Sequence, residues 1–414
     1  MKLAVLVLLS LSLNAQQAYD LVIKGGHVVD PKNNISRVMD VAVANGRIAA
    51  VAANIDASAA KRVASAAGLY VTPGLIDMHV HVYAGTGLKS LTGDLSVYPD
   101  PISFRNGVTT MVDAGTAGWR NFPDFRQRII DRAKTRVLAF LNIGAVGMAP
   151  KGENNPEDMD PDEAIRMTQE NKDVIVGFKV AHFAHGGWLD IQNAVKAGNA
   201  TKRPVMVDFG NVDADRNIST LLLDKLRPGD IYTHCYSGRR LEVLPGGKWN
   251  PVMQAGRKRG VLFDLGHGGA SFYWPVALPA FQEKFYPDTV STDLHMGSVN
   301  AGMKDMLNVM SKMLALGLPV DDVIRMSTWN PAKEIQRTDL GNLDVGAEAD
   351  ITVLQVEKGK FGFLDGAGAR YPGTQRFVAE LTVRKGVVVW DLNGIAAPGW
   401  KDYPYGKTLK VFAQ

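Results

Sequence analysis

The segment LIDMHVH, residues 75–81, follows Pro73-Gly74 and carries the strongest indication of the fold. Its apolar residues predict a short buried strand, and His79 and His81 stand at the carboxyl end of that strand. Side chains two residues apart on a strand point to the same side, so both imidazoles face one side together. Two convergent imidazoles form half of a metal site, although a hydrogen-bonded pair of core histidines would produce the same pattern.

Strands and helical stretches alternate through the middle of the chain. We expect strands near residues 75–82, 108–114, 136–143, 174–181, 204–209, 230–235, 261–266 and 289–294. The clearest helix is expected over 300–316, where Met and Leu recur three and four residues apart. Eight strands separated mostly by helices predict an α/β fold, a (β/α)8 TIM barrel.

Both ends of the chain are rich in short apolar runs separated by turn residues. Asn45-Gly46 lies between two such runs, and this pair is typical of a hairpin turn because both positions require positive φ. We expect the two ends to come together as a small β-sandwich domain. Its predicted residues are 18–72 and 342–414, and the barrel is expected over 73–341.

The first residues have the character of a targeting segment. Lys2 precedes an apolar run from Leu3 to Leu13, and the small residue Ala15 follows. The run is too short to span a bilayer, which needs about 20 residues. Residues 1–15 are therefore predicted to be a secretory signal peptide, and the protein is expected to be exported, periplasmic or secreted, without a membrane span.

Composition excludes several classes of protein and site. The 414 residues are 46% hydrophobic and 21% charged, which is ordinary for a globular chain and unlike a disordered one. A formal charge of +4 gives no indication of a nucleic-acid partner, which usually requires a clustered basic face. Cys235 is the single cysteine, so an internal disulfide and a structural zinc site of several thiolates are excluded.

Further polar residues lie near the carboxyl ends of the predicted strands, where barrel enzymes carry their chemistry. Lys179 lies within an apolar strand, where a charged amine is costly to bury. It could reach the barrel mouth, form an ion pair, or react with carbon dioxide to give a carbamate that bridges two metals. His234 offers a third imidazole, and Asp293 a carboxylate that can bind metal and accept a proton from metal-bound water.

These residues carry a resemblance to the amidohydrolase superfamily. The motifs are PGLIDMHVH at 73–81, THC at 233–235, GHGG at 266–269, STD at 291–293, NPAK at 330–333 and GAEADI at 346–351. Together they resemble the amidohydrolase/deacetylase group, close to dihydroorotase-like enzymes. The resemblance implies a site with two divalent metal ions, usually Zn²⁺, that hydrolyses amides or esters.

Carried over residue by residue, the resemblance implies five metal ligands. One metal takes His79, His81 and Asp293. The second takes His234 and an imidazole at the end of strand five. Lys179, as N6-carboxylysine, bridges the two ions together with a hydroxide.

Strand five departs from the pattern of the family. The family has His in a Met-Val-His context, whereas this chain has Asp208 within MVDFG, residues 206–210. We expect Asp208 to take the ligand position because its spacing and strand-end position fit. His267 is the alternative, and it becomes the ligand if the count of strands is wrong by one.

Several residues are candidates for substrate contact, each with a structural role as the alternative. The family often has an arginine two residues after the lysine, and its absence here removes an inherited contact to a substrate carboxylate. His182 could instead bind substrate, supply a proton or ligate metal. The full set of candidates is His182, His267, His295, Tyr236 and Arg239.

The expected function is that of a binuclear metal-dependent hydrolase, deacetylase-like, acting on a small N-acyl amino acid or O-acyl hydroxy acid. A metal-bridging hydroxide attacks the carbonyl, and Asp293 serves as general base and then acid. A cyclic amidase of the dihydroorotase or hydantoinase type is the first alternative. A degenerate, non-catalytic metal-binding protein is the second. The expected partner is a small molecule, and the chain could also form a homo-oligomer.

Overall fold

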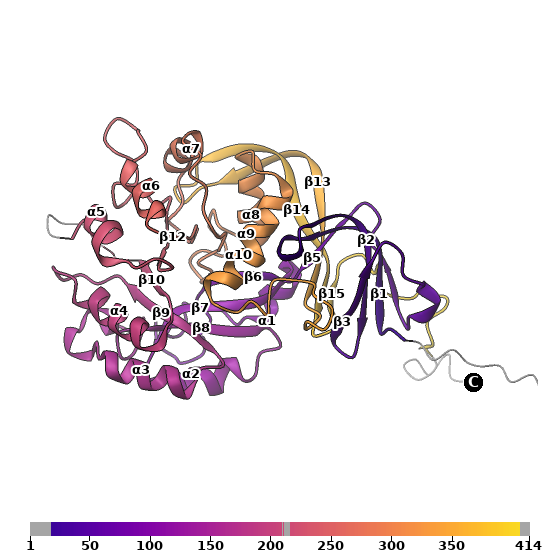
Figure 1. Cartoon of the computed structure of the whole chain (residues 1–414), viewed down its shortest axis with the longest axis horizontal. Helices are drawn as coiled ribbons and strands as arrows, with labels where there is room; N and C mark the ends of the chain where they lie inside the picture. Colours follow the sequence, from indigo (N-terminus) through magenta and orange to yellow (C-terminus); the bar gives the residue numbers. More distant parts are fainter. Residues whose placement is uncertain (1–17, 209, 211–215, 406–414) are drawn as a thin grey trace, which may run out of the picture.

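The computed structural model describes residues 18–208, 210 and 216–405, so the predicted signal peptide lies outside the described residues. The chain forms a barrel and, beside it, a smaller domain of antiparallel and parallel strands (Figure 1). Among the described residues, the structure has no helix that combines the length and the apolar character needed to cross a membrane.

The wall of the barrel is a parallel sheet whose strands are hydrogen-bonded in chain order. Its strands are β6 (Leu75–Val80), β7 (Val108–Gly118), β8 (Arg136–Asn142), β9 (Ile175–Ala181), β10 (Val205–Asp208), β11 (Ile231–Tyr232) and β12 (Leu262–Phe263). The eighth predicted strand, near 289–294, makes two parallel bridges, Thr289 to Asp264 and Leu294 to Val80. These bridges close the sheet between β12 and β6, and the predicted TIM barrel is confirmed.

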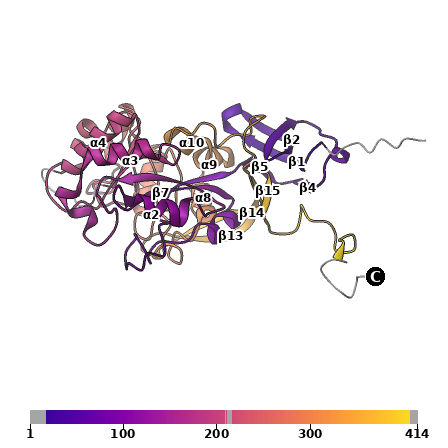
Figure 2. The same cartoon turned by 90° about the horizontal axis from the view of Figure 1, so that it is seen from below.

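Helices cover the outside of the barrel (Figures 1 and 2). They are α1 (Asp100–Ser103), α2 (Phe122–Phe125), α3 (Pro161–Glu170), α4 (Leu189–Thr201), α5 (Ile218–Thr220), α6 (Pro251–Lys258), α7 (Trp274–Gln282), α8 (Met306–Ala315), α9 (Val320–Ser327) and α10 (Trp329–Glu334). The expected helix over 300–316 begins only at Met306. Lys304 adopts φ 65°, and the Asp305 carboxylate then accepts a hydrogen bond from the Asn308 amide, which caps the helix.

The smaller domain is built from both ends of the chain, as expected. Its strands are β1 (Leu21–Asp30), β2 (Ile35–Ala44), β3 (Arg47–Ala52), β4 (Val63–Ser65), β5 (Tyr70–Pro73), β13 (Ile351–Leu364), β14 (Arg370–Arg384) and β15 (Val387–Asp391). They form one hydrogen-bonded sheet in the order β15-β14-β13-β5-β1-β2-β3, with β4 beside β1. Asn45 and Gly46 have φ of 51° and 74°, as the predicted turn requires.

Two connections fix the barrel against this sheet. Gly74 joins β5 to β6, and a Cβ on it would lie 2.2 Å from Oγ1 of Thr109, so only glycine fits. The long β13–β14 hairpin extends along α8 (Figure 1), where the Phe377 amide donates to Oγ of Ser311 over 2.9 Å. The barrel and the smaller domain therefore pack directly against each other.

Candidate metal centre

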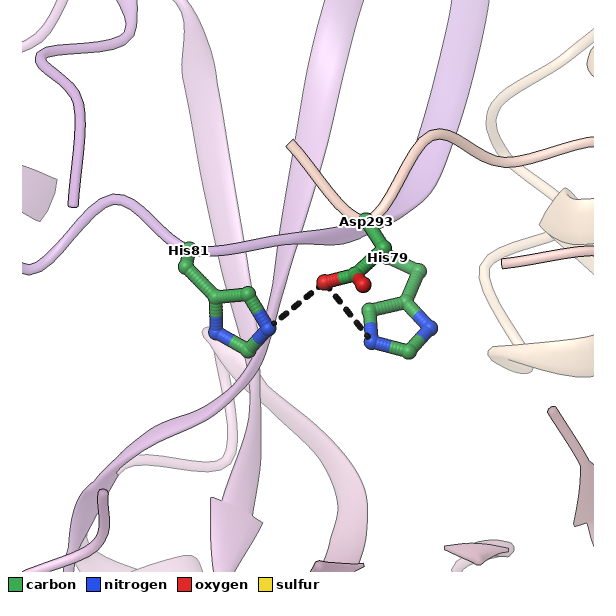
Figure 3. Close-up of side chains that lie close together, drawn as sticks. All are labelled: His79, His81 and Asp293. Atoms are coloured by element: carbon green, nitrogen blue, oxygen red, sulfur yellow. Dashed lines mark ion pairs between the residues drawn. The ribbon is translucent and has the colours of Figure 1, made fainter. Parts of the chain in front are cut away.

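Three ligand-type side chains meet at the barrel mouth (Figure 3). His79 lies in β6, His81 follows that strand, and Asp293 comes from the segment that closes the barrel. Oδ1 of Asp293 lies 3.0 Å from Nε2 of His81 and 3.7 Å from Nε2 of His79. Within the described residues this is the one group whose three ligand atoms all lie within 4.8 Å of one another, so it could hold a metal ion.

Hydroxyl groups hold both imidazoles from behind. Nδ1 of His79 lies 2.9 Å from Oγ1 of Thr233, whose hydroxyl in turn donates to Asp264 over 2.7 Å. Because the Thr233 hydrogen goes to Asp264, Nδ1 of His79 is the donor and its Nε2 keeps a lone pair. Nδ1 of His81 pairs with Oγ1 of Thr116 over 2.8 Å. Partners of this kind orient metal-binding histidines, so the residues fit a divalent ion.

The protonation states of the cluster also suit a cation. Burial and the neighbouring Lys179 lower the pKa of His79 to about 3, so the ring is neutral at physiological pH. Burial by itself raises the pKa of Asp293, but the hydrogen bond with His81 and the surrounding imidazoles hold that pKa below its usual range. A neutral imidazole and an ionised carboxylate are the forms that bind metal.

Lys179 projects from β9 into the same cluster. It is 1% exposed, and its Nζ lies 3.1 Å from Nε2 of His79 and 3.7 Å from Sδ of Met206. Burial lowers the pKa of Lys179 below its usual value. Among the described residues no carboxylate lies within ion-pair distance of Nζ, so the structure does not support the ion-pair alternative for this lysine.

A second group of ligand-type side chains forms around Asp208 at the end of β10. Oδ2 of Asp208 lies 3.1 Å from Nε2 of His234 and 3.3 Å from Nε2 of His182. Nδ1 of His234 lies 2.5 Å from the carbonyl oxygen of Gly266. Nη2 of Arg240 donates to Oδ1 of Asp208 in a short contact. The residue that replaces the family's histidine therefore does face the site, but with a cation bound to it.

Charge and backbone geometry set this second group apart. Burial alone would lower the pKa of His182, but Asp208 and Glu153 raise it to about 11. Burial raises the pKa of Asp208, yet Arg240 and the histidines bring it well below its usual range. His182, His234 and Asp293 adopt φ of 51°, 60° and 51°. Non-glycine residues rarely occupy this left-handed region, and they do so mainly at functional sites.

His267 lies outside both groups. Its ring is fully buried and stacks on Phe272 with ring centroids 4.8 Å apart, and its Nε2 lies 2.5 Å from Nζ of Lys312. The ring therefore faces Lys312 of α8 rather than the ligand cluster. Only the next residue reaches the cluster, since a Cβ on Gly268 would lie 2.3 Å from Oδ2 of Asp293.

Of the remaining predicted substrate residues, one lies near the ligand cluster and two do not contact it. His295 lies near the cluster, with its ring centroid 6.3 Å from that of His81. Tyr236 is fully buried and donates to the carbonyl oxygen of Phe285, so it does not face the site as expected. Arg239 is exposed, and the neighbouring Arg240 points inward instead.

Sequence reasoning missed Asp264, a buried residue that supports the site. Asp264 accepts hydrogen bonds from the hydroxyls of Thr233, Thr289 and Ser291, and thereby ties β11 to the closing segment. Its position at the end of a predicted strand was a usable signal. Arg239 and Arg240 were both possible carboxylate-binding residues, and Arg240 is the one that contacts Asp208.

Comparison with known proteins places this geometry in a family. The Amidohydrolase family profile matches residues 276–389. A deacetylase from Agrobacterium fabrum is 35% identical over 322 residues, which are 75% of this chain and 77% of that protein. A deacetylase from Enterococcus faecalis is 30% identical over 350 residues, which are 82% of this chain and 90% of that protein.

Solved structures show the same architecture. A crystal structure described as an adenine deaminase has a TM-score of 0.81 and 28% identity, covering 90% of this chain and 100% of that chain. One described as a dihydroorotase has a TM-score of 0.78 and 30% identity, covering 90% of this chain and 99% of that chain. The barrel, the strand-end cluster and the length of the sequence match together show that the chain belongs to the amidohydrolase family.

Proposed function

We propose that the chain is a metal-dependent hydrolase that cleaves the amide or ester bond of a small acylated substrate. The buried cluster of His79, His81 and Asp293 supports this proposal most directly, because each imidazole is fixed from behind and turned towards one carboxylate oxygen.

His79, His81 and Asp293 would hold a divalent ion, and their nitrogen and oxygen donors suit Zn²⁺. When bound there, the ion supplies a Lewis acid that polarises a carbonyl oxygen and lowers the pKa of water. Carboxylation of Lys179 is part of the proposal, since its buried amine already lies 3.1 Å from Nε2 of His79. The carbamate would add an anionic oxygen donor to the same cluster.

Asp293 moves the proton in this proposal. Its carboxylate accepts a proton from the attacking water and then delivers it to the leaving nitrogen or oxygen. At 9% exposure it is the most accessible member of the cluster. The Asp293 amide donates to the carbonyl oxygen of His79 over 2.7 Å, which holds the carboxylate against the imidazoles.

The relatives favour an acyl substrate over a cyclic amide. The deacetylases match 75% to 82% of this chain, whereas two dihydroorotases match 33% and 15% of it. We therefore propose an N-acyl amino acid or O-acyl hydroxy acid as substrate. The structure described as a dihydroorotase keeps a cyclic amidase as the second candidate.

A substrate panel tests this proposal. The purified protein would be supplied with Zn²⁺ and bicarbonate and assayed against N-acyl amino acids, O-acyl hydroxy acids and cyclic amides. We expect turnover of an acylated acid and its loss in Asp293→Asn. Turnover of cyclic amides alone would favour the second candidate. The metal content would also be measured in protein that was purified without chelators and before Zn²⁺ is added, and the absence of metal there would refute the metal-dependent reaction.

Export is a separate proposal that rests on residues 1–15 alone. Expression of the full chain in a bacterial host and mass measurement of the product would test it. We expect a mature protein shortened near Ala15 and recovered outside the cytoplasm. A full-length cytoplasmic product would contradict export without affecting the proposed reaction.

A further inference from the structure

The carboxylate of the second ligand group already has a cationic partner. Arg240 lies in the loop after β11, is 3% exposed, and donates from Nη2 to Oδ1 of Asp208. The other oxygen, Oδ2, lies 3.1 Å from His234 and 3.3 Å from His182. Both oxygens of Asp208 are therefore engaged by side chains of the protein. In the first group, by contrast, the ion-pair partners of Asp293 among the described residues are the imidazoles of His79 and His81.

The three ligand-type atoms around Asp208 also lack the spacing of a preformed site. Although each imidazole nitrogen lies close to Oδ2, within the described ranges only His79, His81 and Asp293 bring three ligand atoms within 4.8 Å of one another. His182 and His234 approach Asp208 from two different strand ends. This arrangement fits hydrogen bonding to a central carboxylate better than coordination of a shared ion.

Arg240 is held in this position by several contacts. Its amide donates to Oε2 of Glu242 over 2.9 Å, and its Nε donates to the carbonyl oxygen of Gly210 over 3.4 Å. The guanidinium carbon lies 5.9 Å from the ring centroid of Tyr232. A guanidinium stays charged under all ordinary conditions, and like charges repel strongly in a buried site of low dielectric. A divalent ion at Asp208 would have to lie beside this cation or displace it.

We propose that the Asp208–Arg240 pair takes the place of the second metal, so that the chain binds a single divalent ion at His79, His81 and Asp293. This inference rests on the proposed function, since it assumes that the first group holds a metal. It departs from the two-metal site that the family resemblance implies. It also fits the substitution on strand five, because a carboxylate forms an ion pair with Arg240 and a neutral imidazole would not.

Metal stoichiometry tests this inference directly. The full chain would be incubated with excess Zn²⁺ and bicarbonate, desalted and analysed for zinc by mass spectrometry. We expect one ion per chain in the wild type and in the matched control Arg239→Gln, which alters the exposed neighbour. In Arg240→Gln the count should rise to two, because a guanidinium no longer occupies Oδ1 of Asp208. Arg240→Lys, which keeps the charge, should stay at one.

Two ions in the wild type would overturn the inference, and so would a count of one in a folded Arg240→Gln variant. If that variant does not fold, wild-type protein loaded with Mn²⁺ decides by electron paramagnetic resonance. An isolated six-line spectrum is expected, and an exchange-coupled spectrum would overturn the inference. A wild type that binds no metal would instead refute the proposed function.

Discussion

The two ligand groups at the barrel mouth differ in what stands behind them. His79 and His81 contact the neutral hydroxyls of Thr233 and Thr116, and the Asp264 carboxylate lies behind Thr233, 3.5 Å from Nδ1 of His79. Asp208 is backed by the guanidinium of Arg240, which brings a full positive charge. Both groups contain histidine and aspartate at strand ends of one barrel, and their members are buried except for His182, which is exposed.

Ligand-type residues that lie close together therefore do not by themselves form a metal site. Neutral partners leave the negative charge of a ligand set available for a cation, whereas a buried cationic partner neutralises it. On strand five this protein has Asp208, whose carboxylate pairs with Arg240, where the family has a histidine. The two groups therefore differ more in the residues that contact their ligand-type side chains than in those side chains themselves.

Substitutions that remove one imidazole from each group should change the metal content very differently. His81→Ala should lower the metal content from one ion per chain to none and abolish detectable turnover, because it removes a ligand of the first group. His234→Ala should retain one ion, since it lies in the second group. Zinc analysis and circular dichroism of both variants check this. Loss of metal in His234→Ala with the fold intact would contradict the separation.

The next effect concerns proton transfer within the first group. Asp293→Asn should lower kcat by about 10³-fold, since general acid–base catalysis typically contributes 10²- to 10⁴-fold. The thermal unfolding midpoint should change little because the amide occupies the same volume. Steady-state kinetics on the best substrate of the panel provides the measurement. A kcat equal to that of the wild type would exclude Asp293 as the base.

Much of the fold could be predicted from periodicity and turn residues, because these are local properties. All eight strand positions of the barrel match strands or bridged segments of the structure, as does the turn at Asn45-Gly46. The predicted strand over 230–235 ends early at Tyr232. His234 there adopts φ 60°, a conformation that ends a strand and that no sequence pattern announced.

The site could be predicted only in part, because side-chain direction in loops depends on distant contacts. Arg239 and Arg240 are identical neighbours, yet only Arg240 points to Asp208. The direction of the His267 ring is likewise set by Lys312 on α8, which is 45 residues away in sequence. The strand-end histidines were predictable because a strand fixes the side to which each residue points.

A smaller effect tests the role of the neutral partners. Thr116→Val removes the hydroxyl behind His81 and should weaken zinc affinity by about 10- to 100-fold, the usual consequence of losing such a partner. Thr382→Val is the matched control, since its buried hydroxyl donates to the carbonyl oxygen of Phe104, in the contact between the smaller domain and the barrel. Competition with a fluorescent chelator measures both affinities, and equal losses would show that the effect is merely structural.

The smallest effect concerns the buried pair that binds neither metal group, His267 and Lys312. Burial, with Lys304 nearby, lowers the pKa of Lys312 to about 7 from a usual value of 10.5, so the unfolded chain binds more protons between those values. Stability of the wild type relative to Lys312→Met should therefore rise with pH in that window, by at most about 1.4 kcal/mol per pH unit. Urea unfolding between pH 7 and 10 measures the slope. The stability of the wild type relative to Lys333→Met, at an exposed site, should not change with pH. If the stability relative to Lys312→Met does not change with pH either, Lys312 stays charged in the fold.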